Sequence, residues 1–142
     1  MARELFTTTH DVLHKTLDLR HQRHAVLASN IANAETPGFV AKDVSFEEAL
    51  RAAVAPPPPS SPLQHTHPQH LPRPLSPPPG VSAVQGRLIA SPSNNVGQDL
   101  NTVSIDHEMA KLTTNTFHYN ASADLLSRSY EQLRRTINEG SL

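Results

Sequence analysis

Histidine is the residue type in this sequence that most suggests chemistry. Nine histidines occur among 142 residues, and four of them, His10, His14, His21 and His24, follow one another at offsets of four, seven and three. On a helix these offsets place the rings along one side, where neighbouring pairs could chelate zinc. Leu17 lies in the middle of that side, and no carboxylate is placed to orient the rings. We therefore expect a solvated or subunit-facing helix side and no metal site.

The other motifs that could carry catalysis are incomplete. His107-Glu108 begins like the helix of a zinc protease, but Lys111 occupies the position of the second histidine. Cysteine is absent, which excludes disulfides, thiolate zinc sites and cysteine nucleophiles. The five glycines are isolated, so they form no phosphate-binding loop, and no serine stands in a nucleophile-elbow context. We predict a protein that is not an enzyme, with no catalytic residues and no cofactor.

Charge and hydropathy exclude further classes of partner. The formal net charge is −1, and the Lys and Arg residues are scattered, so no basic face for nucleic acid is expected. No stretch approaches the roughly 18 apolar residues of a membrane span. The N-terminus lacks the apolar run of a cleavable secretory signal. If the protein acts outside the cytoplasm, we expect another route to export it.

Two regions near the ends of the chain have helical periodicity, and these helices must hold any functional side chains in place. In residues 1–39, the apolar side chains of Leu5, Val12, Leu19 and Val26 are spaced by seven. The pattern stops before Thr36-Pro37-Gly38, where proline disfavours helix in its predecessor and glycine permits a turn. The sequence predicts one long helix that ends near Asn33.

The strongest periodicity lies in residues 104–139. Apolar and small residues alternate spacings of four and three over 33 residues, or roughly 50 Å of helix. We call these ten residues the assembly seam: Ile105, Met109, Leu112, Thr116, Tyr119, Ala123, Leu126, Tyr130, Leu133 and Ile137. A seam of this length predicts a long helix with more than one packing partner.

The middle of the chain shows little sign of a core. Residues 40–55 read as a short extended piece followed by a short helix, which Ser45-Phe46-Glu47-Glu48 would start as a capping box. Proline supplies eleven of the 24 residues in 56–79, a histidine-containing tract that we expect to be disordered. Residues 80–103 read as loop, with a possible short strand pair within Val81 to Ala90. The predicted fold is all-α, with the terminal helices packed as a coiled-coil-like pair around a mostly irregular, proline-rich middle.

One segment at the end of the first helix carries the functional signal. It comprises Ala28, Ser29, Asn30, Ile31, Ala32, Asn33, Thr36, Pro37, Gly38 and Phe39. Its small residues allow close approach of another helix, and we expect Asn30 and Asn33 to bond backbone groups left free at the helix end. These properties alone describe any helix C-terminus followed by a turn.

The order of these residues resembles the N-terminal signature of the flagellar rod, hook and hook-associated proteins, Ser-Asn-Ile-Ala-Asn followed by Thr-Pro-Gly-aromatic. We therefore call the ten residues the rod signature. The resemblance covers about residues 5–54 and 95–138, and the short length is most similar to the proximal rod members of that family. It implies terminal helices that pair into the wall of an axial tube, with a variable middle.

The resemblance also implies a role, partners and a location. The chain would be a structural subunit of the proximal rod of the flagellar basal body, in the periplasm, exported through the flagellar type III apparatus without a cleaved signal peptide. Its partners would be other copies of itself, other rod subunits, and the membrane-ring and export-gate components of the flagellar base. The alternative from residue patterns alone is a soluble coiled-coil adaptor or export chaperone with a proline-rich recruiting segment. An adaptor has no reason to carry the rod signature.

Overall fold

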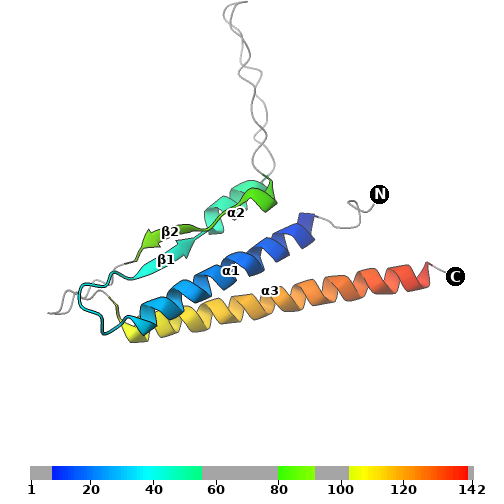
Figure 1. Cartoon of the computed structure of the whole chain (residues 1–142). Helices are drawn as coiled ribbons and strands as arrows, with labels where there is room; N and C mark the ends of the chain where they lie inside the picture. Colours follow the sequence, from blue (N-terminus) through cyan, green and yellow to red (C-terminus); the bar gives the residue numbers. More distant parts are fainter. Residues whose placement is uncertain (1–7, 56–79, 92–102, 141–142) are drawn as a thin grey trace, which may run out of the picture.

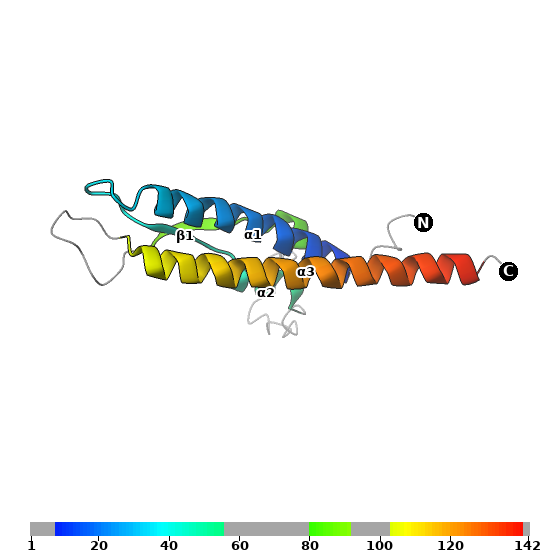
Figure 2. The same ribbon diagram turned by 90° about the horizontal axis from the view of Figure 1, so that it is seen from below.

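Two long helices dominate the structure, a computed structural model that describes residues 8–55, 80–91 and 103–140. Helix α1 spans Thr8–Ala32 and helix α3 spans Ile105–Glu139. They pack side by side and antiparallel, with the start of α3 beside the end of α1 (Figures 1 and 2). The prediction of long, paired terminal helices is therefore confirmed. Within the described ranges, no helix is both long and apolar enough to cross a membrane.

The fold is mostly helical, as predicted, but it also contains a small antiparallel sheet that the all-α prediction did not include. Strand β1, Lys42–Ser45, pairs with strand β2, Arg87–Ala90, with Lys42 opposite Ala90. The expected strand pair within Val81 to Ala90 does not form, because Val81–Ala83 is the 3-10 turn η2. The two strands lie far apart in the sequence and run along α1 (Figure 1). Short strands that pair across such a separation leave no local turn signal.

The short helix α2, Glu47–Val54, begins differently from the predicted capping box. Ser45 is the last residue of β1, and Phe46 occupies the N-cap position without a side-chain hydrogen bond. The Phe46 backbone N–H instead donates to Glu47 Oε2 at 3.2 Å. The capping box does not form, because α2 begins at Glu47 and its N-cap position therefore falls on Phe46, one residue after Ser45. The expectations for the tract 56–79, and for Leu5, lie outside the described residues.

The hydrophobic core lies between α1, the sheet and α2. Leu19, Val44, Phe46 and Val84 form its buried cluster, and Val26, Leu50 and Ala53 pack against them. Gly86 permits this packing, because a Cβ there would lie 2.6 Å from Val44 Cγ1 and 3.4 Å from Leu19 Cδ2. The core holds β1, α2 and η2 against one side of α1. Among the described residues, this cluster includes no residue of α3, and the buried Leu126 of α3 lies outside it.

Candidate assembly interface

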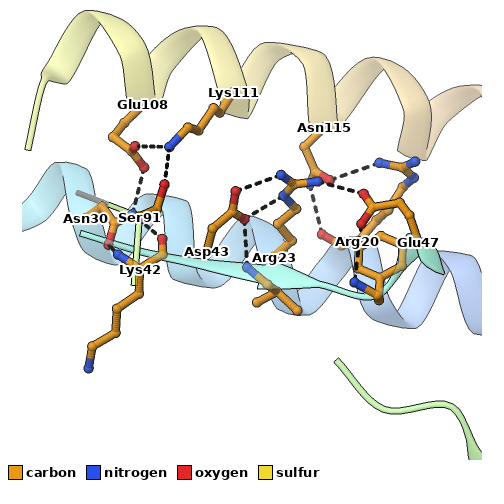
Figure 3. A network of polar contacts seen from close by, with 12 residues as sticks. Arg20, Arg23, Asn30, Lys42, Asp43, Glu47, Ser91, Glu108, Lys111 and Asn115 are labelled. Atoms are coloured by element: carbon orange, nitrogen blue, oxygen red, sulfur yellow. Dashed lines mark hydrogen bonds and ion pairs between the residues drawn. The ribbon is translucent and has the colours of Figure 1, made fainter. Parts of the chain in front are cut away.

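The side chain of Asn30 joins three elements at the end of α1. Its amide nitrogen donates to the Lys42 carbonyl at 2.6 Å and to Glu108 Oε2 at 2.7 Å, while its amide oxygen accepts from the Lys42 N–H at 3.0 Å (Figure 3). Asn30 is buried. The rod signature was expected to bond the free helix end through this residue. Asn30 instead fixes α1 to β1 and to α3.

The carboxylate of Glu108 is the buried centre of this contact. Only 2% of Glu108 is exposed. Lys111 Nζ pairs with Glu108 Oε1 at 2.7 Å and also donates to Ser91 Oγ at 3.1 Å. Both carboxylate oxygens are therefore satisfied, as a buried charge requires. Removing either Asn30 or Lys111 would leave a buried acceptor short of a partner.

The rest of the rod signature forms the turn that follows α1. Asn33 Nδ2 donates to the Ser29 carbonyl at 2.8 Å, which satisfies an acceptor in the last turn of the helix. The Thr36 N–H donates to the Asn33 carbonyl at 3.0 Å, and Gly38 has a φ of 71°, which favours glycine. The chain reverses here and delivers β1 alongside α1.

The rod signature also presents an outer surface. Ile31, Asn33 and Phe39 are half-buried, and the exposed members are Ala28, Ser29, Ala32, Thr36, Pro37 and Gly38. Small exposed residues at the end of α1 allow the backbone of another helix to approach closely. The signature thus combines one buried anchor, Asn30, with a surface of small side chains.

An arginine in the middle of α1 fixes the sheet and α2. Arg23 makes a two-point ion pair with Asp43, Nε to Oδ1 and Nη2 to Oδ2, both at 2.7 Å. Its Nη1 also contacts Glu47 Oε1 at 2.9 Å. Burial lowers the pKa of Arg23, but the hydrogen bonds and charges of Asp43 and Glu47 outweigh it and raise the net pKa above the ordinary value. This ion pair sets the orientation of β1 along α1.

Arg20 and Asn115 make the central contact between the two long helices. Asn115 Nδ2 donates to the Arg20 carbonyl at 2.9 Å, and Arg20 Nη1 donates to Asn115 Oδ1 at 3.4 Å. The Arg20 guanidinium lies 5.6 Å from the centre of the Phe46 ring. Burial is the largest cause that lowers the pKa of Arg20 from its ordinary value. Its Nε is buried and has no hydrogen-bond partner within the described residues.

The histidine row lies against α3 and is only partly solvated. His10 is buried, with Nε2 at 2.9 Å from Ser129 Oγ, and His14 Nε2 shares a hydrogen bond of 2.7 Å with the Tyr130 hydroxyl. His21 and His24 line a groove between α1 and α3. The expected solvated or subunit-facing side is therefore wrong for His10, because α3 of the same chain covers it. The described residues contain no group of three or more side chains placed to hold a metal.

The assembly seam does not lie as one buried line. Leu126 is buried, and Leu112, Ala123 and Leu133 are half-buried. The exposed members are Ile105, Met109, Thr116, Tyr119, Tyr130 and Ile137. In the first half of α3, the buried residues are the polar Glu108 and Asn115. Tyr130 still contacts His10 and His14 of α1, and Thr116 and Tyr119 line the groove between the helices, so only part of the seam is left for other partners.

Sequence reasoning missed a line of polar residues on α3, three of which bond α1. Glu108, Asn115, Ser122 and Ser129 recur every seven residues on α3, and the first two are buried while the others are half-buried. This second heptad repeat, made of polar residues, was the sequence signal that could have predicted which side of α3 faces α1. It was overlooked because an apolar heptad line beside it is the usual sign of a helix contact.

Comparisons with known proteins agree with the rod signature. The profile of the family described as "Flagella basal body rod protein" matches residues 12–39. The flagellar basal body rod protein FlgB of Escherichia coli (strain K12) is 33% identical over 137 residues, which cover 89% of this chain and 91% of that protein. FlgB of Aquifex aeolicus (strain VF5) is 28% identical over 123 residues, 87% of each chain. This chain therefore belongs to the FlgB family of flagellar basal body rod proteins.

Proposed function

We propose that this chain is a structural subunit of the proximal rod of the bacterial flagellar basal body. The subunit assembles through exposed faces of its long helices into the axial tube that transmits torque. The observation that supports this most is the distribution of polar and apolar side chains around α3. Glu108 and Asn115 are buried, whereas Met109 and Phe117 remain exposed.

The exposed apolar side chains of α3 supply the driving force for assembly. Large hydrophobic residues at about half exposure or more extend along most of the helix: Ile105, Met109, Phe117, Leu125 and Ile137. These side chains would be buried where another subunit packs against α3. Each Å² that a neighbour covers contributes roughly 25 cal/mol. A single chain leaves this stabilisation unused.

The proposed partners follow from membership of the family of flagellar basal body rod proteins. They are other copies of this chain, other rod subunits, and the membrane-ring and export-gate components of the flagellar base. The subunit would lie in the periplasmic rod. Family membership supports a structural role and not an enzymatic one.

A substitution at an exposed seam residue tests the proposal. In a strain that lacks the native gene, the Met109→Asp variant should fail to restore swimming, because it places a charge in the subunit contact. Met109 is 48% exposed, so the fold of the single chain should be unaffected. Asp106→Asn, at an exposed position three residues earlier on α3, is the matched control, and cells that carry it should swim.

Two results would contradict the proposal. If the strain without the gene swam normally, the chain would not be a rod subunit. If Met109→Asp restored both swimming and the rod in isolated basal bodies, α3 would not assemble through this face. Circular dichroism of the purified variant checks that the helices are retained.

A further inference from the structure

A groove between α1 and α2 has no occupant among the described residues. Its volume is about 540 Å³, and its lining includes Val12 and Thr16 from α1 and Leu50 and Val54 from α2. The buried ring of Phe46 also lines it. Val54 is half exposed although it is apolar. The groove therefore offers apolar walls to a side chain that enters from outside.

Arg51 gives the rim of the groove a positive charge. Arg20 also lines the groove, but its Nη1 donates to Asn115 of α3 and its Nε is buried. Arg51 forms no ion pair within residues 8–55, 80–91 and 103–140. Glu47, the acidic lining residue, is already engaged by Arg23. The groove suits an apolar ligand that carries a carboxylate.

The outer stripe of α3, which we define as Phe117, Ala121 and Leu125, has matching chemistry. Phe117 is 70% exposed and Leu125 is 57% exposed. Asp124 lies next to Leu125 and makes no ion pair in the described ranges. The stripe is thus an apolar ridge accompanied by one unpaired carboxylate.

The spacing of the groove matches the spacing of the stripe. Val12, Thr16 and Arg20 follow one another at intervals of four along α1, as do the three residues of the outer stripe along α3. Eight residues of helix span about 12 Å at 1.5 Å per residue. Rows of side chains at intervals of four are the ridges and grooves that interlock when two helices pack.

We propose that the α1–α2 groove of one copy binds the outer stripe of α3 from a second copy, with Asp124 beside Arg51. This inference rests on the proposed role as a rod subunit. Because groove and stripe are different surfaces of one chain, the contact is heterologous and leaves a free groove and a free stripe at the two ends. It can therefore be repeated from copy to copy along an assembly.

Cysteine cross-linking tests the contact directly, since the chain contains no cysteine of its own. A gene that encodes the full chain with Val54→Cys and Leu125→Cys replaces the native gene. The cells are treated with an oxidant before basal bodies are isolated. We expect a ladder of cross-linked dimers and larger species on a non-reducing gel. Ala52→Cys with Leu125→Cys is the matched control, because Ala52 is exposed on α2 and does not line the groove. It should give no ladder.

The failure of this contact can be told apart from failure of the proposed function. Uncross-linked subunit in basal bodies from swimming cells would overturn the contact and leave the rod assignment intact. The chain's own residues 1–7, which contain Leu5, are the rival occupant. An intramolecular cross-link between Leu5→Cys and Val54→Cys would favour that rival and overturn the proposal.

A charge exchange covers the case in which the cysteine variants fail to assemble. Arg51→Asp and Asp124→Arg should each reduce swimming, and the double variant should restore it because the ion pair is re-formed with its signs reversed. If the single variants had simply lost their fold, the double variant would not regain swimming. Single variants that swim like the parent, or a double variant as impaired as the worse single variant, would overturn the proposal.

Discussion

The side of α3 that faces α1 and the side that faces away from it differ in polarity. Towards α1 lie Glu108 and Asn115, both buried, followed by the half-buried Ser122 and Ser129. Away from it, Phe117 and Leu125 are more than half exposed. A helix of an ordinary soluble domain turns its apolar stripe inward and its polar residues outward. In the first half of α3, by contrast, the two buried residues are polar, and Phe117 is exposed.

The difference separates two tasks within one helix. Each hydrogen bond between α1 and α3 contributes only about 0.5–1.5 kcal/mol net, but a displaced helix would leave Glu108 and Asn30 without their partners. The polar line therefore sets the register of the helices more than it stabilises them. In the proposed assembly, the exposed apolar side chains of α3 would be buried in contacts between subunits. The following changes test this division, from the largest expected effect to the smallest.

The largest effect is expected where the apolar seam does reach α1. Leu126 is 8% exposed, and Leu126→Asp would place an unpaired carboxylate in that contact. The free energy of unfolding should fall by about 4 kcal/mol, measured by urea denaturation, and swimming should be lost. Glu131→Gln, on the exposed surface of the same helix, should leave both unchanged. Normal stability of Leu126→Asp would show that the helices do not pair through this residue.

Lys111→Met should have the next largest effect, because it leaves the buried Glu108 carboxylate without its ion pair. We expect a loss of about 3 kcal/mol in the free energy of unfolding. Adding Glu108→Gln should recover most of that loss, since the neutral amide can still accept from Asn30. A double variant no more stable than Lys111→Met alone would show that the ion pair is not what makes the single change harmful.

Gly86→Ala should weaken the sheet while leaving the helix pair in place. The new Cβ would lie 2.6 Å from Val44 Cγ1 and 3.2 Å from Gln22 Oε1, so the chain just before β2 must shift relative to β1 and α1. A decrease of about 2 kcal/mol in the free energy of unfolding is expected. Gly80→Ala, which meets nothing within 4 Å, is the matched control. Equal stability of the two variants would mean that β2 does not pack this closely.

Removal of the proline tract should have the smallest effect. The tract joins α2 to η2, and these two elements contact each other, so a direct link from Ala55 to Gly80 has little distance to cover. The loop-closure term changes by at most about 1 kcal/mol. Cells with residues 56–79 deleted should swim, whereas cells with residues 30–38 deleted should not. Equal loss of swimming would make the tract a structural or recognition element.

The parts of this fold that were predictable from sequence are those governed by local periodicity. The ends of α1 and α3 follow from heptad spacing together with Thr36-Pro37-Gly38 and Gly140, all within a few residues of the helices they limit. The pairing of β1 with β2 was not predictable, because each strand has only four residues and they lie far apart in the chain. Strands of that length carry little periodic signal.

The candidate interface shows the same limit. The rod signature and the apolar seam are visible as patterns, but the role of Asn30 depends on Glu108, which is 78 residues away. Residue types alone suggested that Asn30 would bond the helix end, as Asn33 does. The polar heptad from Glu108 to Ser129 was visible in principle. Its role can be recognised only when the structure shows which side of α3 faces α1.

The central claim is that assembly covers the apolar side of α3 while its polar line already faces α1 in the single chain. Maleimide labelling of single-cysteine variants tests it, because the parent chain contains no cysteine. The Met109→Cys variant should react rapidly as a free subunit and become protected in isolated basal bodies. The Ser122→Cys variant, on the side facing α1, should react slowly in both. Rapid labelling of Met109→Cys in basal bodies from swimming cells would contradict the account.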